Sequence, residues 1–173
     1  RHETVVKDYD GVMVTSGSQQ IMDFLSKCLC NEGDLVVCEN PSFLGALNAF
    51  KSNGAKLVGI DMEDDGINLE QLEAVLSGVQ KPKFIYLIPN FQNPTGITTS
   101  LEKRQAIYTL AKKYQVLILE DNPYGTLRFK GKTIPTLKSI DTEGIVVYCA
   151  SLSKIISPGI RLGTIIANKE IID

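Results

Sequence analysis

The run Ile145-Val146-Val147-Tyr148-Cys149-Ala150-Ser151-Leu152-Ser153-Lys154 begins as an apolar, β-branched stretch and ends in two hydroxyls and a lysine. A short, nearly continuous apolar run is typical of a strand buried on both faces, because a half-buried strand alternates apolar and polar side chains. Six further runs share this pattern, at residues 12–15, 35–38, 56–60, 84–88, 116–120 and 162–167. The sequence therefore predicts seven strands.

Segments with helical spacing separate the strands, at residues 19–30, 43–52, 69–76 and 101–114. Asn68 and Ser100 directly precede two of them, where a side-chain oxygen can cap the free N–H groups of a first turn. Alternating strands and helices favour a mostly parallel sheet covered by helices on both faces. We expect a single α/β domain over residues 1–173, with three α/β/α layers and no internal linker or repeat.

Length and composition describe an ordinary globular domain. The chain has 173 residues, 43% of them hydrophobic, and a net charge of −2, so no electrostatic case for nucleic acid follows. Neither a signal sequence nor an apolar run long enough to span a bilayer is present in these residues. The four cysteines are scattered and the single histidine, His2, is near the start, so we expect no metal site, reduced thiols and a cytoplasmic protein.

The two ends of the chain suggest a piece of a longer polypeptide. The first residue is Arg1 rather than methionine, and residues 167–173 resemble a strand that enters a new helix. The alternative is a complete small domain.

Polar residues follow five of the predicted strands, at residues 16–20, 40–43, 90–96, 121–124 and 151–154. In open α/β sheets, ligands bind outside the carboxyl ends of the strands. Gly17, Ser18 and Gln19 join the first strand to a helix, whose free N–H groups and dipole form an anion site. The alternative there is a tight turn with Ser18 as a helix cap.

Lys154 precedes Arg161 by seven residues, and Pro158-Gly159 lies between them. A Pro-Gly turn folds the chain back and brings Arg161 toward Ser151 and Ser153. Arginine forms forked hydrogen bonds with phosphate, whereas lysine forms an imine with a carbonyl. The alternative is a pair of solvated surface side chains.

Four further residues are chemically marked. Asp121 ends the most apolar strand, where an acid is costly unless a cation or a donor meets it, although it can also cap a turn. Asn93 can offer an amide to a ligand oxygen or merely belong to a proline-rich turn. Tyr124 can donate a hydrogen bond or pack. Phe43 can stack on a flat ring or belong to the core.

Four motifs, taken in chain order, carry a resemblance to a known family. They are Ser-Gly-Ser-Gln, Asn-Pro-Thr-Gly, Asp-x-Pro-Tyr and Ser-x-Ser-Lys-(x6)-Arg-x-Gly. Together they resemble the pyridoxal-phosphate aminotransferases of fold type I, class I/II, from Ser16 to Gly163. The stretch at residues 121–129 looks most like the branch of 2-aminoadipate and aromatic aminotransferases, and like the aminotransferase-like domains of MocR-type regulators.

The resemblance implies a role for each marked residue toward pyridoxal 5′-phosphate. Lys154 would form the Schiff base and move the proton between the substrate Cα and the cofactor C4′. Asp121 would pair with the pyridine nitrogen, and Asn93 and Tyr124 would bind the phenolic oxygen. Phe43 would stack on the ring. The phosphate would be held by the helix start at Gly17, Ser18 and Gln19 together with Ser151, Ser153 and Arg161.

The resemblance also implies a larger assembly. The domain would be the cofactor-binding large domain, with residues 162–167 as the one antiparallel strand of seven. The N-terminal segment and the C-terminal small domain, which supplies an arginine for the substrate carboxylate, would be absent, so these residues alone would be inactive. The full protein would be a homodimer that transfers an amino group between an amino acid and a 2-oxo acid. A cofactor-sensing regulator of the MocR type and a lyase or decarboxylase remain alternatives.

Overall fold

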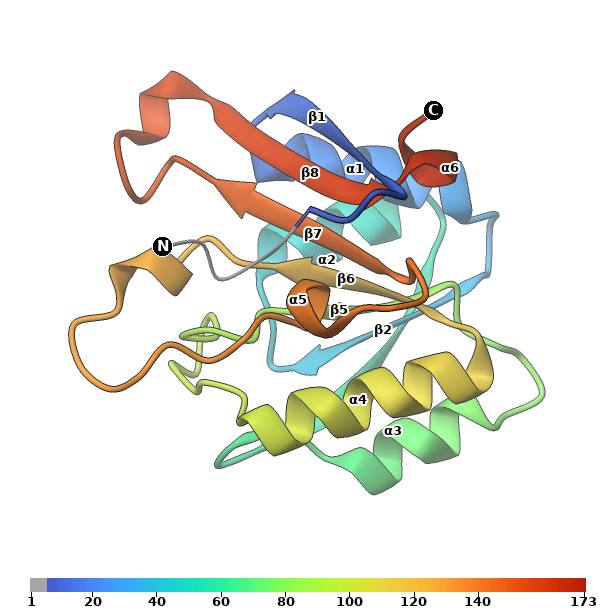
Figure 1. Ribbon diagram of the computed structural model, residues 1–173. Coiled ribbons are helices and arrows are strands. Elements are labelled where there is room, and N and C mark those ends of the chain that lie inside the picture. Colours follow the sequence, from blue (N-terminus) through green and yellow to red (C-terminus); the bar gives the residue numbers. More distant parts are fainter. Residues whose placement is uncertain (1–5) are drawn as a thin grey trace.

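The computed structural model describes residues 6–173, so Arg1 and His2 lie outside the described residues. Its centre is one sheet between two layers of helices (Figure 1). The strands are β1 (Asp10–Ser16), β2 (Leu35–Asn40), β3 (Lys56–Glu63), β4 (Gly66–Ile67), β5 (Phe84–Leu87), β6 (Leu117–Asp121), β7 (Val146–Ser151) and β8 (Leu162–Asn168). All seven predicted strands are thus confirmed to within three residues at each end.

The strand order is β1-β8-β7-β6-β5-β2-β3-β4. β2, β3, β5, β6 and β7 pair in parallel, whereas β8 is antiparallel to both of its neighbours, β1 and β7. The prediction of seven strands with one antiparallel strand needs a correction, because the two-residue β4 adds an eighth strand, antiparallel to β3. A strand of two residues is too short to show any side-chain periodicity.

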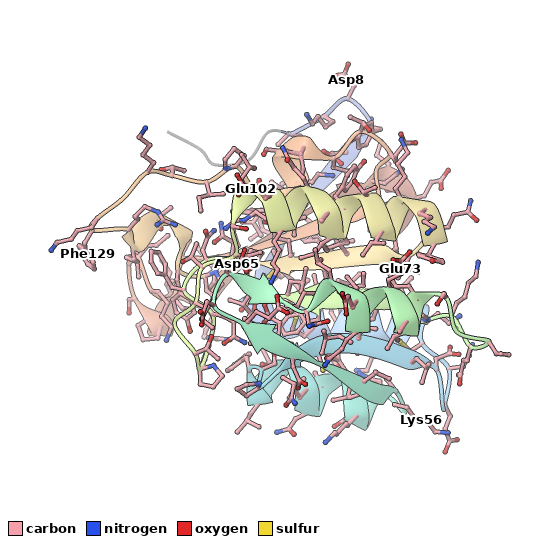
Figure 2. The ribbon with its side chains drawn as sticks, turned by 90° about the horizontal axis from the view of Figure 1, so that it is seen from below. Asp8, Lys56, Asp65, Glu73, Glu102 and Phe129 are labelled. Carbon is pink, nitrogen blue, oxygen red and sulfur yellow. The ribbon has the colours of Figure 1, made fainter. Side chains whose placement is uncertain are left out.

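The two helical layers bury separate cores. Helices α1 (Ser18–Leu29) and α2 (Leu44–Ser52) cover one face, while α3 (Leu69–Leu76), α4 (Leu101–Tyr114) and the short α5 (Leu137–Ile140) cover the other. Figure 2 views the second face, with Glu73 on α3 and Glu102 on α4. Asn68 and Ser100 cap α3 and α4 as expected, accepting hydrogen bonds from Gln71 N at 2.8 Å and Lys103 N at 3.2 Å. The last helix, α6 (Lys169–Ile172), confirms the strand-to-helix reading of residues 167–173.

The described residues also bear on membranes, metals and thiols. Within residues 6–173, no helix has the length and apolar character that crossing a membrane requires. In the same residues, no cluster of three His, Cys, Asp or Glu side chains has the arrangement of a metal site. All four cysteines are free.

A buried ion cluster fastens β1 to α5, 128 residues further along the chain. Lys138 Nζ contacts Asp10 Oδ1 at 2.7 Å and Asp141 Oδ2 at 3.3 Å, and all three side chains are fully buried. Lys138 Nζ also donates to Val146 O at 3.1 Å, so its donors are used. The cluster joins β1, α5 and β7 at the edge of the sheet where β1 and β7 begin.

We expect Lys138→Met to lower the free energy of unfolding by about 3 kcal/mol or more, because two buried carboxylates lose their shared cation. Urea unfolding of the full-length protein at neutral pH measures the change. The matched control is Lys112→Met, which removes an exposed ion pair with Glu143 and should change stability little. Equal stability of the two variants would contradict the assignment.

Candidate functional site

A cavity of about 420 Å³ opens at the carboxyl edge of the parallel strands. Ten of the eleven residues marked in the sequence line it, and they are Ser18, Gln19, Phe43, Asn93, Asp121, Tyr124, Ser151, Ser153, Lys154 and Arg161. The eleventh, Gly17, lies at the start of α1 beside the wall. Ile88, Pro123 and Pro158 complete the lining and were not predicted.

The topology explains why residues so far apart in the chain meet here. β2, β5, β6 and β7 are parallel and end at this edge, so the residues that follow each strand reach the same place. β8 runs the opposite way, so its first residues lie at this edge instead. The register places Leu162 opposite Ser16 and Gly163 opposite Ser151, which brings Arg161 to the cavity.

The start of α1 forms the cationic end of the cavity. Its N-cap is Gly17, at φ 74°, and no side chain caps the first turn. The alternative with Ser18 as the cap is therefore wrong, since Ser18 is already the first helical residue. Arg161 Nη2 donates to Ser16 O at 3.3 Å and so stands beside the helix start. Uncapped N–H groups next to a guanidinium suit a phosphate.

Glycine permits this close approach at two positions. A Cβ on Gly17 would lie 2.5 Å from Arg161 Nη2, and a Cβ on Gly163 would lie 2.9 Å from Ser18 N. A Cβ on Gly163 would require a shift of the backbone, whereas a Cβ on Gly17 would displace the Arg161 guanidinium. Gly163 is the last residue of the Ser-x-Ser-Lys-(x6)-Arg-x-Gly motif, and the structure shows that it lets β8 pass against the start of α1.

Asp121 is buried, with 3% of its surface exposed, and its two oxygens differ. Oδ2 accepts a hydrogen bond from the Tyr86 hydroxyl at 2.9 Å, whereas Oδ1 has no hydrogen-bond partner among the described residues. Burial raises the pKa of Asp121 to about 6, and the Tyr86 hydroxyl and the Cys149 thiol act in the opposite direction. The turn-cap alternative is wrong, because Asn122 accepts from Gly125 N instead.

Tyr86 was missed in the sequence. The only signal was an aromatic residue with a polar hydroxyl inside a strand that is otherwise fully apolar, at residues 84–88. A buried tyrosine hydroxyl needs a partner, and Asp121 provides it 35 residues further along the chain.

Three side chains line the part of the cavity between β2, β5 and β6. Asn93 Nδ2 lies 3.5 Å from the Tyr124 hydroxyl, so the two polar groups converge. Phe43 is half-buried and packs on the core beneath α1 and α2, and it also lines the cavity, where stacking on a ring stays a prediction. A Cβ on Gly45 would lie 2.5 Å from the Phe43 ring. Gly45 therefore supports the site by leaving room for the Phe43 ring, and no sequence pattern indicates this role.

Lys154 lies in the turn that follows β7. Ser153 N donates to Ser151 Oγ at 3.2 Å, and Leu152 N donates to Leu162 O at 3.0 Å, which fixes the turn against β8. Lys154 is exposed on this chain and lines the same cavity as Asp121. An amine and a buried carboxylate thus share one space.

These residues fit the cofactor expected from the sequence, a phosphorylated pyridine that carries an aldehyde. The cavity volume of about 420 Å³ is in the usual range for small-molecule sites. Buried oxygens normally have a hydrogen-bond partner, and the unpartnered Oδ1 of Asp121 is suited to a protonated ring nitrogen. The uncapped helix start suits the phosphate, and Lys154 provides the amine for the aldehyde.

Comparisons with known proteins agree with this geometry. The family model for aminotransferases of class I and II matches residues 1–173. The chain is 40% identical to "Aromatic-amino-acid aminotransferase 1" of Thermococcus litoralis, over 99% of this chain and 42% of that protein. It is 34% identical to "Uncharacterized HTH-type transcriptional regulator YisV" of Bacillus subtilis, over 94% of this chain and 33% of that protein.

A solved structure has the same fold. The kynurenine aminotransferase of Pyrococcus horikoshii, in complex with "PMP, KYN as substrates and KYA as products", superimposes with a TM-score of 0.93 and 37% identity. The match covers 96% of this chain and 42% of that one. The chain therefore spans less than half the length of the proteins that it matches.

Proposed function

The chain belongs to the family of class I and II aminotransferases, and from that premise we propose that the full-length protein transfers an amino group between an amino acid and a 2-oxo acid. The proposed cofactor is pyridoxal 5′-phosphate. The observation that supports this best is a single cavity that holds the Lys154 amine, the unpartnered Oδ1 of Asp121 and the uncapped start of α1 beside Arg161.

When bound, pyridoxal 5′-phosphate supplies an electron-accepting ring for the amino-acid substrate. Asp121 Oδ1 would hold a proton on the ring nitrogen, while Tyr86 orients the other oxygen of Asp121. Asn93 and Tyr124 would donate hydrogen bonds to the phenolic oxygen, and Phe43 would stack on the ring face. Each of these residues positions the ring or sets its charge.

The remaining residues bind the phosphate and move a proton. The phosphate would be held by the N–H groups of α1 at Ser18 and Gln19, the hydroxyls of Ser151 and Ser153, and the Arg161 guanidinium. Gly17 lets the guanidinium approach. Lys154 Nζ would hold the cofactor through its aldehyde when no substrate is bound and, once the substrate amine has displaced it, the freed amine would carry the proton from the substrate Cα to C4′.

We further propose a homodimer in a reducing, cytoplasmic compartment. Large apolar side chains next to the cavity are exposed on this chain, at 71% for Leu44, 47% for Ile155 and 63% for Ile156, which is consistent with cover from other protein. Four free cysteines are consistent with a reducing compartment.

The test is amino transfer by the purified full-length protein. Aromatic amino acids and 2-aminoadipate serve as donors and 2-oxoglutarate as the acceptor, and we expect glutamate to form together with the 2-oxo acid of the donor. Without acceptor, one 2-oxo acid per site should appear, because the two halves of the reaction are separate. Continuous release of carbon dioxide or ammonia without acceptor would contradict transfer and favour a lyase or decarboxylase.

A regulator is the second candidate function, supported by the likeness to the B. subtilis protein named as an HTH-type regulator. It predicts cofactor binding with no turnover, and a full-length sequence with a DNA-binding helix-turn-helix. Measured transfer at ordinary enzymatic rates would exclude it as the main function.

A further inference from the structure

Glu39 is a buried carboxyl behind the cavity wall, outside the lining. It lies near the carboxyl end of β2 with 2% of its surface exposed, on the side of the sheet where its neighbour Val37 packs beneath α3 and α4. Each of its oxygens accepts one hydrogen bond. Oε1 accepts from Ile88 N at 3.1 Å, and Oε2 accepts from Gln92 Nε2 at 3.0 Å. Both partners are donors, so the site is built for a carboxylate.

Gln92 extends this connection to two loops. Its Nε2 donates a second hydrogen bond to Pro41 O at 2.8 Å, and its Oε1 accepts from Thr95 N at 2.9 Å and Thr95 Oγ1 at 2.8 Å. A primary amide has two donor hydrogens and two acceptor sites. All four are used, and Gln92 is 2% exposed, so its orientation is fixed.

The three segments joined in this way each contribute to the cavity wall. Gln92 directly precedes Asn93, Pro41 lies two residues before Phe43, and Ile88 is itself in the lining. We propose that Glu39 is a positioning residue, which acts through Gln92 to hold Phe43 and Asn93 at the spacing that the cofactor ring requires. This inference rests on the proposed function.

The two accepting oxygens of Glu39, and not only its shape, maintain this arrangement. Burial raises the pKa of Glu39 to about 7, and the charge of Asp121 adds to the rise, while the hydrogen bonds from Gln92 and Ile88 lower the pKa. A glutamine at this position would turn an NH₂ group toward one of the two donors. One arm of the connection would then be lost, because two donors cannot pair.

The test compares Glu39→Gln with the wild-type full-length protein loaded with pyridoxal 5′-phosphate. We expect the dissociation constant for the cofactor to rise about tenfold and the visible circular dichroism of the bound cofactor to change, because that signal reports the orientation of the ring. The visible absorbance itself should remain, since Lys154 is untouched.

The matched control is Glu120→Gln. Glu120 is as fully buried as Glu39, and its oxygens accept hydrogen bonds from Leu137 N at 2.9 Å and Lys138 N at 2.8 Å, next to α5 and outside the cavity lining. This variant should lose stability while it keeps the wild-type dissociation constant and circular dichroism. Equal changes in both variants would overturn the proposal, because they would reflect general destabilisation.

A milder variant keeps the test decisive if Glu39→Gln folds poorly. Thr95 is exposed, so Thr95→Val leaves the core unchanged. It removes the hydroxyl that donates to Gln92 Oε1 and accepts from Ile97 N. It should shift the dissociation constant and the circular dichroism in the same direction as Glu39→Gln, but less.

Two different outcomes would contradict the positioning role of Glu39 and the proposed function. Unchanged values in both Glu39→Gln and Thr95→Val would overturn the positioning role alone. A wild-type protein that develops no visible absorbance with pyridoxal 5′-phosphate would overturn the proposed function, and the positioning role with it.

Discussion

Replacement of Lys154 by alanine is expected to abolish the visible absorbance band of the imine between pyridoxal 5′-phosphate and the full-length protein, and to slow amino transfer by about 10⁴-fold. Within the described part of the chain, Lys154 is the one lysine that lines the cavity. No other amine is therefore in place to bond to the aldehyde or to take the proton from the substrate Cα. Binding through the helix start, Arg161 and Asp121 should survive, so the cofactor still associates.

Absorbance spectra and single-turnover transfer rates, measured with saturating cofactor, check this result. The control is Lys132→Ala, because Lys132 is exposed in the loop before α5 and does not line the cavity. That variant should match the wild type. Undiminished absorbance and transfer in Lys154→Ala would assign the chemistry to another group and remove the basis of the proposed function.

Replacement of Asp121 by asparagine is expected to slow amino transfer by about 10³-fold and yet to stabilise the cofactor-free protein at alkaline pH. An amide cannot hold a proton on the ring nitrogen, so the electron-accepting character of the ring is weakened. The folded protein meanwhile no longer has to bury the charge of Asp121. Asparagine can still accept the Tyr86 hydroxyl, so packing should be preserved.

The sign of the pH dependence follows from the raised pKa. Folding raises the pKa of Asp121 from its ordinary value of 3.8 to about 6, so the folded state holds this proton more tightly than the unfolded state does. The wild type therefore loses stability as the pH rises from about 4 through about 6, by about 3 kcal/mol in total. The Asp121→Asn variant has no carboxyl group at this position, so it should not lose this stability as the pH rises.

Urea unfolding of both cofactor-free proteins between pH 4 and pH 8 measures the difference. The two stabilities should approach each other near pH 4, and the variant should be the more stable one above about pH 6. Glu39 also has a raised pKa, but it is present in both proteins and its contribution cancels to first order. If the variant is less stable than the wild type at pH 8, burial of the charged Asp121 carboxylate does not destabilise the folded protein, and the prediction from its pKa is wrong.

Most of the fold could be predicted because its elements are long enough to show a pattern. All seven apolar runs form strands, and the four segments with helical spacing form α1 to α4. The two-residue β4 and the four-residue α5 were missed, since neither completes enough turns or alternations to show periodicity. α5 also depends on Glu120, which lies in β6. The oxygens of Glu120 accept hydrogen bonds from Leu137 N and Lys138 N in the first turn of α5.

The lining of the site could be predicted where chemistry marks a residue at a strand end, as it does for Asp121, Asn93 and Lys154. The supporting residues could not. Tyr86 and Glu39 lie inside apolar strands, and their partners are 35 and 53 residues away along the chain for the bonds to Asp121 and Gln92. Gly163 matters only because β8 passes the start of α1 at contact distance.

The sequence alone determined which segments are strands and helices and which polar residues follow them, because periodicity, caps and turns depend on neighbours within a few positions. The tertiary structure alone decided that one oxygen of Asp121 is paired with Tyr86 and the other has no partner. It also decided that Arg161 meets an uncapped helix, since this requires β8 to lie between β1 and β7. Both depend on how distant strands are ordered in the sheet, and no local pattern encodes that order.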